Sequence, residues 1–204
     1  MRLHDSHQAE MVSQLLKGET FVVLQQKGNW TQIRCDYDGY TGWVHNKEWK
    51  KLTPEIEKQL KEEEQRAIAT KATSPSEVAN KDYLNAPYLW GGRSRHGVDC
   101  SGLVQVCFKA CGIQLPRDCS QQVNEGVEVT SLEKAQKDDI CFFVSYDKHV
   151  EKGQKPTHVG IYMGDGHIIH SSGQVRIDRL DKTGIYNEEC QGYSHRLIAI
   201  KRIK

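Results

Sequence analysis

Residues 98–112 read VDCSGLVQVCFKACG, and this stretch decides the fold of the larger part of the chain. At 100° per residue it predicts a helix with one apolar face. That face collects Cys100, Leu103, Val104, Cys107 and Cys111. Asp99 is well placed as the N-cap and Gly112 as the C-terminal stop. We therefore expect the helix to begin at Cys100.

Cys100 differs from the other cysteines of this face because it stands at the helix start. Free backbone amides and the positive end of the helix dipole favour a thiolate there, which predicts a pKa below the ordinary value of about 8.5. Cys107 and Cys111 lie a turn or more inside the helix, where a free cysteine packs as a small hydrophobe. The pattern indicates that Cys100 is a nucleophile.

A thiolate nucleophile needs a base and a third group that orients the base. His158 opens an alternating strand over 158–163 and lies on the face opposite to its apolar residues. Residues 164–166, Gly-Asp-Gly, are a strong turn signal that returns the chain through 167–170. A hairpin with histidines in both strands is therefore expected.

The loop length of this hairpin decides which second histidine joins His158. A three-residue loop pairs Gly160 with His170, which puts His170 diagonally from His158 on the same face. A two-residue loop puts His167 on that face instead. The sequence leaves both arrangements open.

Four motifs now stand in order along the chain. They are Tyr88-x-Trp90-Gly91-Gly92, Asp99-Cys100-Ser101-Gly102-Leu103-Val104, Leu115-Pro116-Arg117, and His158-Val159-Gly160-Ile161-Tyr162 followed by His170. This ordered set resembles the NlpC-type papain-like cysteine peptidases, which cut bacterial cell-wall peptides. The resemblance implies an α+β papain-like fold with Cys100 as nucleophile, His158 as general base and His170 as the orienting third member. Tyr88 and the backbone amide of Cys100 are then the expected oxyanion donors.

The N-terminal part has a different pattern. Short strands are predicted over 20–24, 30–34 and 42–45, separated by turn residues, and strands of this spacing imply a small barrel. The order Gly28-Asn29-Trp30, then Gly39-Tyr40-Thr41-Gly42-Trp43, resembles a bacterial SH3-like domain. This resemblance implies that the first strand of the barrel lies ahead of residue 1.

We therefore predict three parts: an SH3-like domain over 1–53, a linker helix within 54–79 and an NlpC-type peptidase domain over 80–204. The linker prediction rests on residues 54–71, which are rich in Glu, Lys and Gln and hold no internal Gly or Pro. The alternative is that the second half of this stretch is a solvated face of the second domain.

This domain order resembles the γ-D-glutamyl-L-diamino acid endopeptidases, also called dipeptidyl-peptidase VI. The resemblance implies a substrate with a free amino-terminal L-Ala, from which L-Ala-D-Glu is released, in murein peptide recycling or wall turnover. The substrate-binding residues carried over by position are Glu10, Tyr40, Trp90, Asp99, Ser101, Arg117, Asp118, Cys119 and Ser120. Cys119 departs from the pattern, because relatives commonly have serine there.

The chemistry of these side chains agrees with such a substrate. Glu10 and Asp99 can pair with the ammonium of L-Ala, and Arg117 can hold the D-Glu carboxylate by a forked hydrogen bond. The alternatives are that Asp99 only caps the helix and that Arg117 only braces a loop.

Composition narrows the classes of partner. With 28 Lys and Arg against 27 Asp and Glu, the net charge of +1 argues against nucleic acid. The longest apolar runs, 21–24 and 140–144, are far shorter than a membrane span. The seven cysteines show no C-x-x-C pair or zinc-finger spacing, so we expect no metal and no cofactor.

The compartment and the competing functions follow from the same observations. The polar residues 1–10 hold no secretory signal, which favours the cytoplasm, or the periplasm or exterior if a leader precedes this chain. We expect a monomer. The alternatives to the endopeptidase are a peptidoglycan-binding adaptor without activity and a papain-like amidase or acyltransferase.

Overall fold

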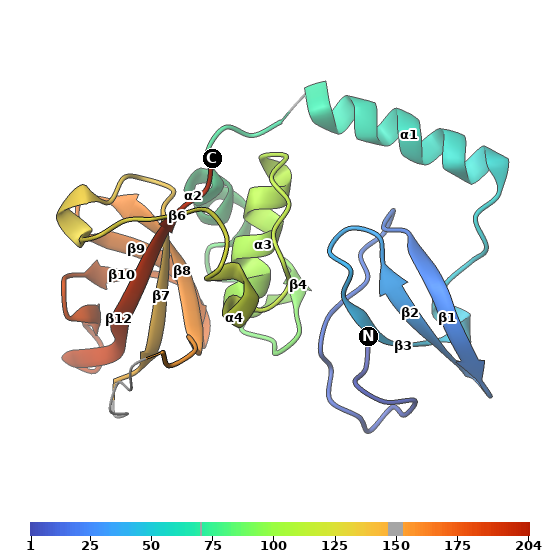
Figure 1. Cartoon of the computed structure of the whole chain (residues 1–204), viewed down its shortest axis with the longest axis horizontal. Coiled ribbons are helices and arrows are strands. Elements are labelled where there is room, and N and C mark those ends of the chain that lie inside the picture. The colour runs from blue at the N-terminus through green and yellow to red at the C-terminus, as the bar shows by residue number, and fades with distance from the viewer. Residues whose placement is uncertain (70, 147–152) are drawn as a thin grey trace.

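The computed structural model describes residues 1–69, 71–146 and 153–204. The N-terminal part forms a three-stranded antiparallel sheet in the order β1-β2-β3, with bounds Phe21–Lys27, Trp30–Cys35 and Thr41–His45 (Figure 1). Ile33, Cys35 and Val44 form its small core. The three predicted strands are confirmed, and a 3-10 turn (Asn46–Glu48) follows them.

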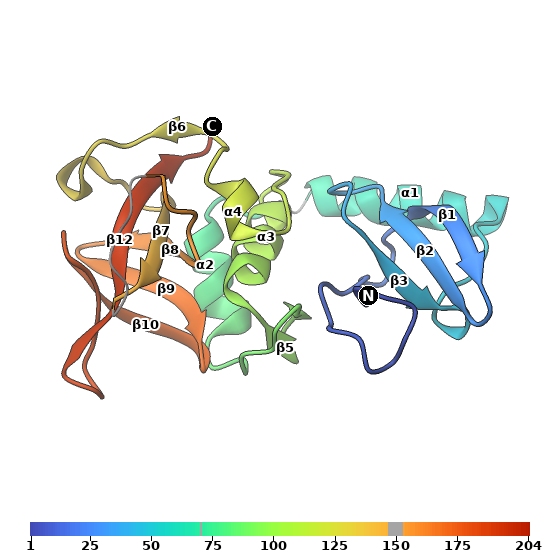
Figure 2. The same ribbon diagram turned by 60° about the horizontal axis from the view of Figure 1, so that its bottom comes forward.

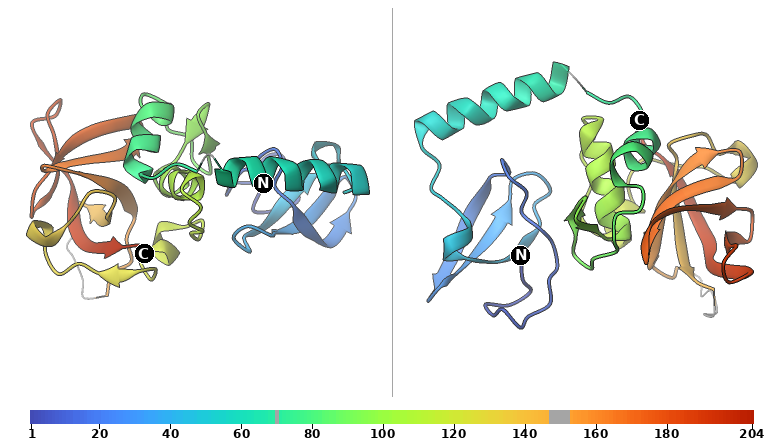
Figure 3. Two further views of the ribbon diagram at one scale, coloured as in Figure 1. Left: turned by 90° about the horizontal axis from the view of Figure 1, so that it is seen from above. Right: turned by 180° about the vertical axis from the view of Figure 1, so that it is seen from behind.

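The linker helix, α1 (Pro54–Ala69), begins where the sequence predicts and runs along one side of the N-terminal sheet (Figure 3). Its described side chains are mostly exposed, and Lys61 pairs with Glu57 one turn earlier. Residue 70, within the predicted helix, lies outside the described residues.

The C-terminal domain packs short helices against a seven-stranded sheet in the order β11-β10-β9-β8-β7-β12-β6 (Figure 2). The strands of this sheet are β6 (Val127–Glu128), β7 (Ile140–Ser145), β8 (His158–Gly164), β9 (His167–Ser172), β10 (Gln174–Leu180), β11 (Gly184–Asn187) and β12 (Gly192–Arg202). The other elements are α2 (Pro75–Val78), a π turn (Ala79–Tyr83), the β4–β5 pair (Arg93–Ser94, Gly97–Val98), α3 (Cys100–Ala110), α4 (Cys119–Gln122) and a 3-10 turn (Leu132–Lys134). The predicted α+β class is confirmed.

The predicted central helix, α3, lies between the sheet and the N-terminal domain (Figure 1). Its apolar face, with Leu103, Val104 and Cys107, joins Ile140, Val159 and Ile169 of the sheet in the main core. Burial of this face positions the first turn of α3 against β8.

The β8–β9 hairpin has a two-residue loop, Asp165-Gly166. A regular hairpin with this loop would place His167 on the face of His158. His167 is instead exposed. The three-residue loop is therefore a wrong prediction. The expectation that a two-residue loop brings His167 to His158 is also wrong.

A β-bulge explains the difference. The register of the hairpin shifts by one residue at Met163, so that Gly160 still pairs with His170. The extra residue in one strand has the same effect on the pairing as a longer loop. His170 is therefore the histidine that joins His158.

Candidate active site

Cys100 is the first residue of α3, as predicted, and only 7% of it is exposed. Oδ1 of Asp99 caps the helix by accepting the backbone N–H of Gly102 at 2.7 Å. The backbone N–H of Val159, the residue after His158 on β8, hydrogen-bonds the Cys100 sulfur and favours its ionised form. The helix start thus brings the thiol of Cys100 to the first residues of β8.

The prediction of a lowered pKa at Cys100 is wrong. Burial raises the pKa of the Cys100 thiol to about 12, and the negative charge of Asp99 acts in the same direction. The backbone N–H groups of Val159 and Ser101 lower it by less. Desolvation penalises a charged thiolate more than the helix start stabilises it. Cys100 is therefore a neutral thiol in the resting protein.

The two histidines and one carboxylate form a continuous hydrogen-bonded chain. Nε2 of His158 lies 2.8 Å from Nδ1 of His170, and Nε2 of His170 lies 3.0 Å from Oδ2 of Asp178 on β10. All three residues are buried, with 5%, 1% and 5% exposed. The remaining ring nitrogen of His158, Nδ1, takes part in neither of these two contacts.

His195 on β12 covers the ring of His158. The two rings are stacked, with centroids 4.1 Å apart and an interplanar angle of 22°. Burial, followed by the charges of His170 and His195, lowers the pKa of His158 well below its usual 6.5. His158 is therefore a neutral imidazole near neutral pH, the form that its predicted role as general base requires.

Tyr88 lies close enough to Cys100 for their charges to interact, which fits the predicted oxyanion donor. Burial raises the pKa of Tyr88 to about 12, with the charges of Cys100 and Asp99 as further causes. The phenol therefore keeps its proton and can donate it in a hydrogen bond. Its backbone N–H is tied to the carbonyl of Gly173, which fixes the segment.

Asp99 and Arg117 form a buried, forked ion pair. Nη1 of Arg117 donates to Oδ1 of Asp99 at 3.0 Å and Nη2 donates to Oδ2. Arg117 is 2% exposed and also donates to the hydroxyls of Ser101 and Ser13. This geometry corresponds to the bracing alternative, because the fork expected to face a substrate carboxylate is occupied by Asp99. A contact of Arg117 with D-Glu stays a prediction.

This geometry agrees with sequence comparisons. The family model described as "NlpC/P60 family" matches residues 85–193, which is more than half of the chain. The chain belongs to the NlpC/P60 family. A second model, described as "Bacterial dipeptidyl-peptidase Sh3 domain", matches residues 3–48 and confirms the SH3-like domain.

Relatives of this NlpC/P60 chain include proteins named gamma-D-glutamyl-L-lysine dipeptidyl-peptidase. The one from Bacillus cereus is 38% identical over 131 residues, which is 63% of this chain and 38% of the relative. The one from Bacillus subtilis is 39% identical over 111 residues, 52% of this chain and 35% of the relative. The chain thus spans little more than a third of the length of either.

A crystal structure of an NlpC/P60 family protein from Bacillus cereus shares the fold. It is 26% identical, with a TM-score of 0.51 over 89% of this chain and 53% of the other. The family and its endopeptidase-named members support a cysteine peptidase.

The SH3-like domain of this NlpC/P60 protein reaches the predicted substrate residues. Trp90, which is 59% exposed, donates its indole N–H to Oε1 of Glu10 at 2.7 Å. Tyr40 hydrogen-bonds Asp118, and burial raises the pKa of Tyr40 to about 12. The SH3-like domain and the peptidase domain therefore meet at residues that the family resemblance assigns to substrate binding.

Two other predicted contacts, Cys119 and Ser120, lie at the start of α4 and are partly buried. The thiol of Cys119 donates to the carbonyl oxygen of Pro156 at 3.3 Å. Its charge, if ionised, would interact with Cys100. Cys119 thus lies near Cys100, and the substrate contacts of Cys119 and Ser120 stay predictions.

Sequence reasoning missed Asp178 and His195. In β10, Asp178 lies two residues before buried Leu180, so both side chains point to the same face of the strand. A carboxylate on this inward face was the sequence feature that could have revealed Asp178. His195 lies on β12 two residues before the register between β12 and β7 shifts. No local sequence pattern marks it as part of the site.

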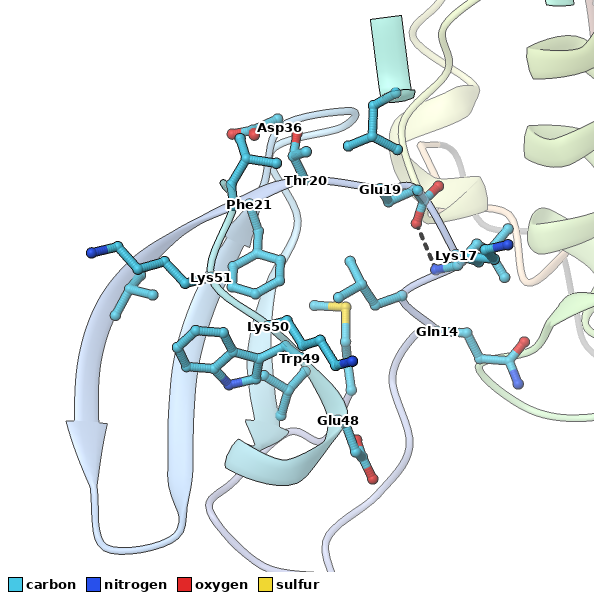
Figure 4. A pocket seen from close by; sticks show the side chains of 18 of the residues that line it. Gln14, Lys17, Glu19, Thr20, Phe21, Asp36, Glu48, Trp49, Lys50 and Lys51 are labelled. Carbon is cyan, nitrogen blue, oxygen red and sulfur yellow. Dashed lines mark hydrogen bonds between the residues drawn. The ribbon is translucent and has the colours of Figure 1, made fainter. Parts of the chain in front are cut away.

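One cavity lies apart from these residues. It has a volume of about 1120 Å³ and lies between the SH3-like domain and α1, with Phe21, Trp49 and Leu60 in its lining (Figure 4). Cys100, His158 and His170 do not line it. Within residues 1–69, 71–146 and 153–204, no group of three or more His, Cys, Asp or Glu could hold a metal ion. None of the described helices is long and apolar enough to cross a membrane.

Proposed function

We propose that this protein is a cysteine endopeptidase that hydrolyses the bond between γ-D-Glu and the diamino acid of cell-wall stem peptides. The observation that carries the proposal is a buried thiol at a helix start, beside a strand whose first residue is a neutral, hydrogen-bonded histidine. The SH3-like domain and the relatives named gamma-D-glutamyl-L-lysine dipeptidyl-peptidase support the substrate class.

The proposed reaction starts from neutral groups. His158 accepts the thiol proton at Nδ1 as the sulfur of Cys100 attacks the γ-carbonyl carbon. Tyr88 and the backbone N–H of Cys100 donate to the oxygen that becomes negative. His158 then gives its proton to the leaving amine of the diamino acid, and water hydrolyses the resulting thioester.

The proposed substrate end is a free amino-terminal L-Ala. Glu10 and Asp99 are the carboxylates offered to its ammonium, one from each domain. Acylation of this nitrogen removes its positive charge and adds bulk where the SH3-like domain meets the peptidase domain. Released wall peptides, whose amino group is free, are therefore the proposed substrates.

Paired peptides test this proposal. L-Ala-γ-D-Glu-L-Lys and its N-acetyl form are incubated with the reduced protein, and the products are separated by chromatography. We expect L-Ala-D-Glu from the free peptide and a kcat/KM about 10- to 100-fold lower for the acetylated one. Cys100→Ser should abolish cleavage, whereas Cys190→Ser, at an exposed thiol, should not change it.

Each contrary outcome has a distinct meaning. Equal kcat/KM for both peptides would contradict recognition of the free amino group and favour a general wall hydrolase. Cleavage of neither peptide by the reduced protein would contradict the proposed γ-D-glutamyl specificity. Transfer of the acyl group to an added amine in preference to water would indicate an acyltransferase.

A further inference from the structure

The chain of hydrogen bonds behind Cys100 does not end at the second histidine. Asp178 is buried on β10, next to β9 in the sheet, and its Oδ2 lies 3.0 Å from Nε2 of His170. Its second oxygen, Oδ1, accepts Nε and Nη2 of Arg176 at 3.1 and 3.0 Å, and Nε also lies 2.9 Å from Oδ2. Both oxygens of this carboxylate are thus engaged by named donors.

Asp178 is ionised in the folded protein. Burial alone would raise its pKa, but hydrogen bonds from His170 and Arg176 outweigh burial and lower the pKa below the usual 3.8. An ionised carboxylate only accepts hydrogen bonds. His170 must therefore carry its proton on Nε2 in order to bond Asp178.

The position of the proton on His170 also determines the position of the proton on His158. With a single proton, on Nε2, His170 has an unprotonated Nδ1, which can only accept. The 2.8 Å contact then requires His158 to donate from Nε2, so Nδ1 of His158 carries no proton. We propose that Asp178 is a positioning residue that sets the tautomers of both histidines and thereby leaves Nδ1 of His158 free to take the proton of Cys100.

The competing role for Asp178 is structural, as a partner that compensates the charge of Arg176. An isosteric variant separates the two roles. In Asp178→Asn, Nη2 of Arg176, which donates to Oδ1, keeps the amide oxygen at that position. The NH2 group then takes the place of Oδ2 and faces Nε2 of His170. His170 must then accept there, move its proton to Nδ1 and donate to His158. The proton of His158 is thereby forced onto Nδ1, where it blocks the base.

We therefore expect Asp178→Asn to lower kcat by about 100-fold or more with KM changed less than threefold, since a wrong tautomer disables proton transfer and leaves binding intact. Asp178→Ala should lose less activity than Asp178→Asn, because it leaves His170 free to adopt either tautomer. A structural role predicts the opposite order, with the isosteric Asn as the milder change. Asp165→Asn, at the exposed turn of the β8–β9 hairpin, is the matched control and should keep wild-type kcat.

A spectroscopic readout keeps this inference separate from the proposed peptidase function on which it rests. Nitrogen NMR of the ¹⁵N-histidine-labelled full chain reports which ring nitrogen carries the proton, with His170→Gln used to assign the signals. We expect Nε2–H on both His158 and His170 in the wild type, and Nδ1–H on both in Asp178→Asn. This measurement needs no substrate, so a protein that cleaves no peptide would contradict the peptidase proposal while the role of Asp178 is still tested. Nδ1–H on His170 in the wild type, or unchanged tautomers in Asp178→Asn, would overturn the inference.

Discussion

At the scale of single residues, burial dominates the electrostatics of the candidate site. The helix start at Cys100 should favour a thiolate, yet desolvation raises its pKa, and burial lowers the pKa of His158. Both shifts favour neutral forms. The resting site is therefore a thiol and an imidazole, and in the proposed reaction the proton moves only when the substrate is attacked.

The same shifts predict how stability depends on pH. Burial lowers the pKa of His195 from 6.5 to about 4, so between these values the unfolded state binds a proton that the folded state does not. The free energy of unfolding should thus fall as pH drops below 6.5, by up to about 1.4 kcal/mol per pH unit for this group. His158 adds to the fall in the same direction.

Denaturant unfolding between pH 7 and pH 4.5 measures this dependence. His195→Phe keeps a ring over His158 and should reduce the pH slope. His167→Asn, which removes an exposed histidine from the neighbouring hairpin, should leave the slope unchanged. An unchanged slope in His195→Phe would show that His195 is not responsible.

At the scale of elements, the β8–β9 hairpin delivers His170 to His158 through two features that act together. The bulge at Met163 supplies the register. Gly160 supplies the space, because a Cβ there would lie 2.9 Å from Cβ of His170 and 2.8 Å from Cδ1 of Ile168. The position of the orienting histidine therefore depends on the absence of a side chain on the opposite strand.

Gly160→Ala should consequently displace His170. We expect a loss of about 1–3 kcal/mol in the free energy of unfolding, from overpacking, and a lower kcat, from misorientation of His158. Thermal unfolding and peptide kinetics measure the two effects. Gly192→Ala, where the nearest atom to a new Cβ is 3.8 Å away, is the control and should change neither. Wild-type kcat in Gly160→Ala would contradict the need for this space.

At the scale of the whole molecule, polar contacts hold the SH3-like domain against the peptidase domain. Glu19 forms a buried ion pair with Arg93 at 2.8 Å and also binds Lys109 of α3 at 2.7 Å. Gly91, beside Trp90, packs against the backbone of Met11, where a Cβ would come within 2.6 Å of its carbonyl oxygen. These contacts fix the segment that carries Glu10 beside Trp90.

Glu19→Ala should loosen this interface. The variant leaves Arg93 buried without its partner, which costs about 3 kcal/mol of stability. We expect a lower Tm and a smaller ratio of kcat/KM between the free and N-acetylated tripeptides, because Glu10 is no longer held in place. Glu48→Ala, at an exposed position of the same domain, should preserve both quantities. If Glu19→Ala keeps the wild-type ratio of kcat/KM between the two peptides, the selectivity does not depend on this domain contact.

The sequence by itself determined the features that depend on local pattern: the helix that begins at Cys100, the strand that begins at His158, the three strands of the N-terminal domain and the order of the motifs. Periodicity and capping act within a few residues, so a single chain displays them. Only the tertiary structure decided the pairing of Arg117 with Asp99, the neutral state of Cys100 and the contact of Asp178 with His170. Each of these depends on burial and on neighbours from separate segments, which exist only after the helix and the strands have packed together.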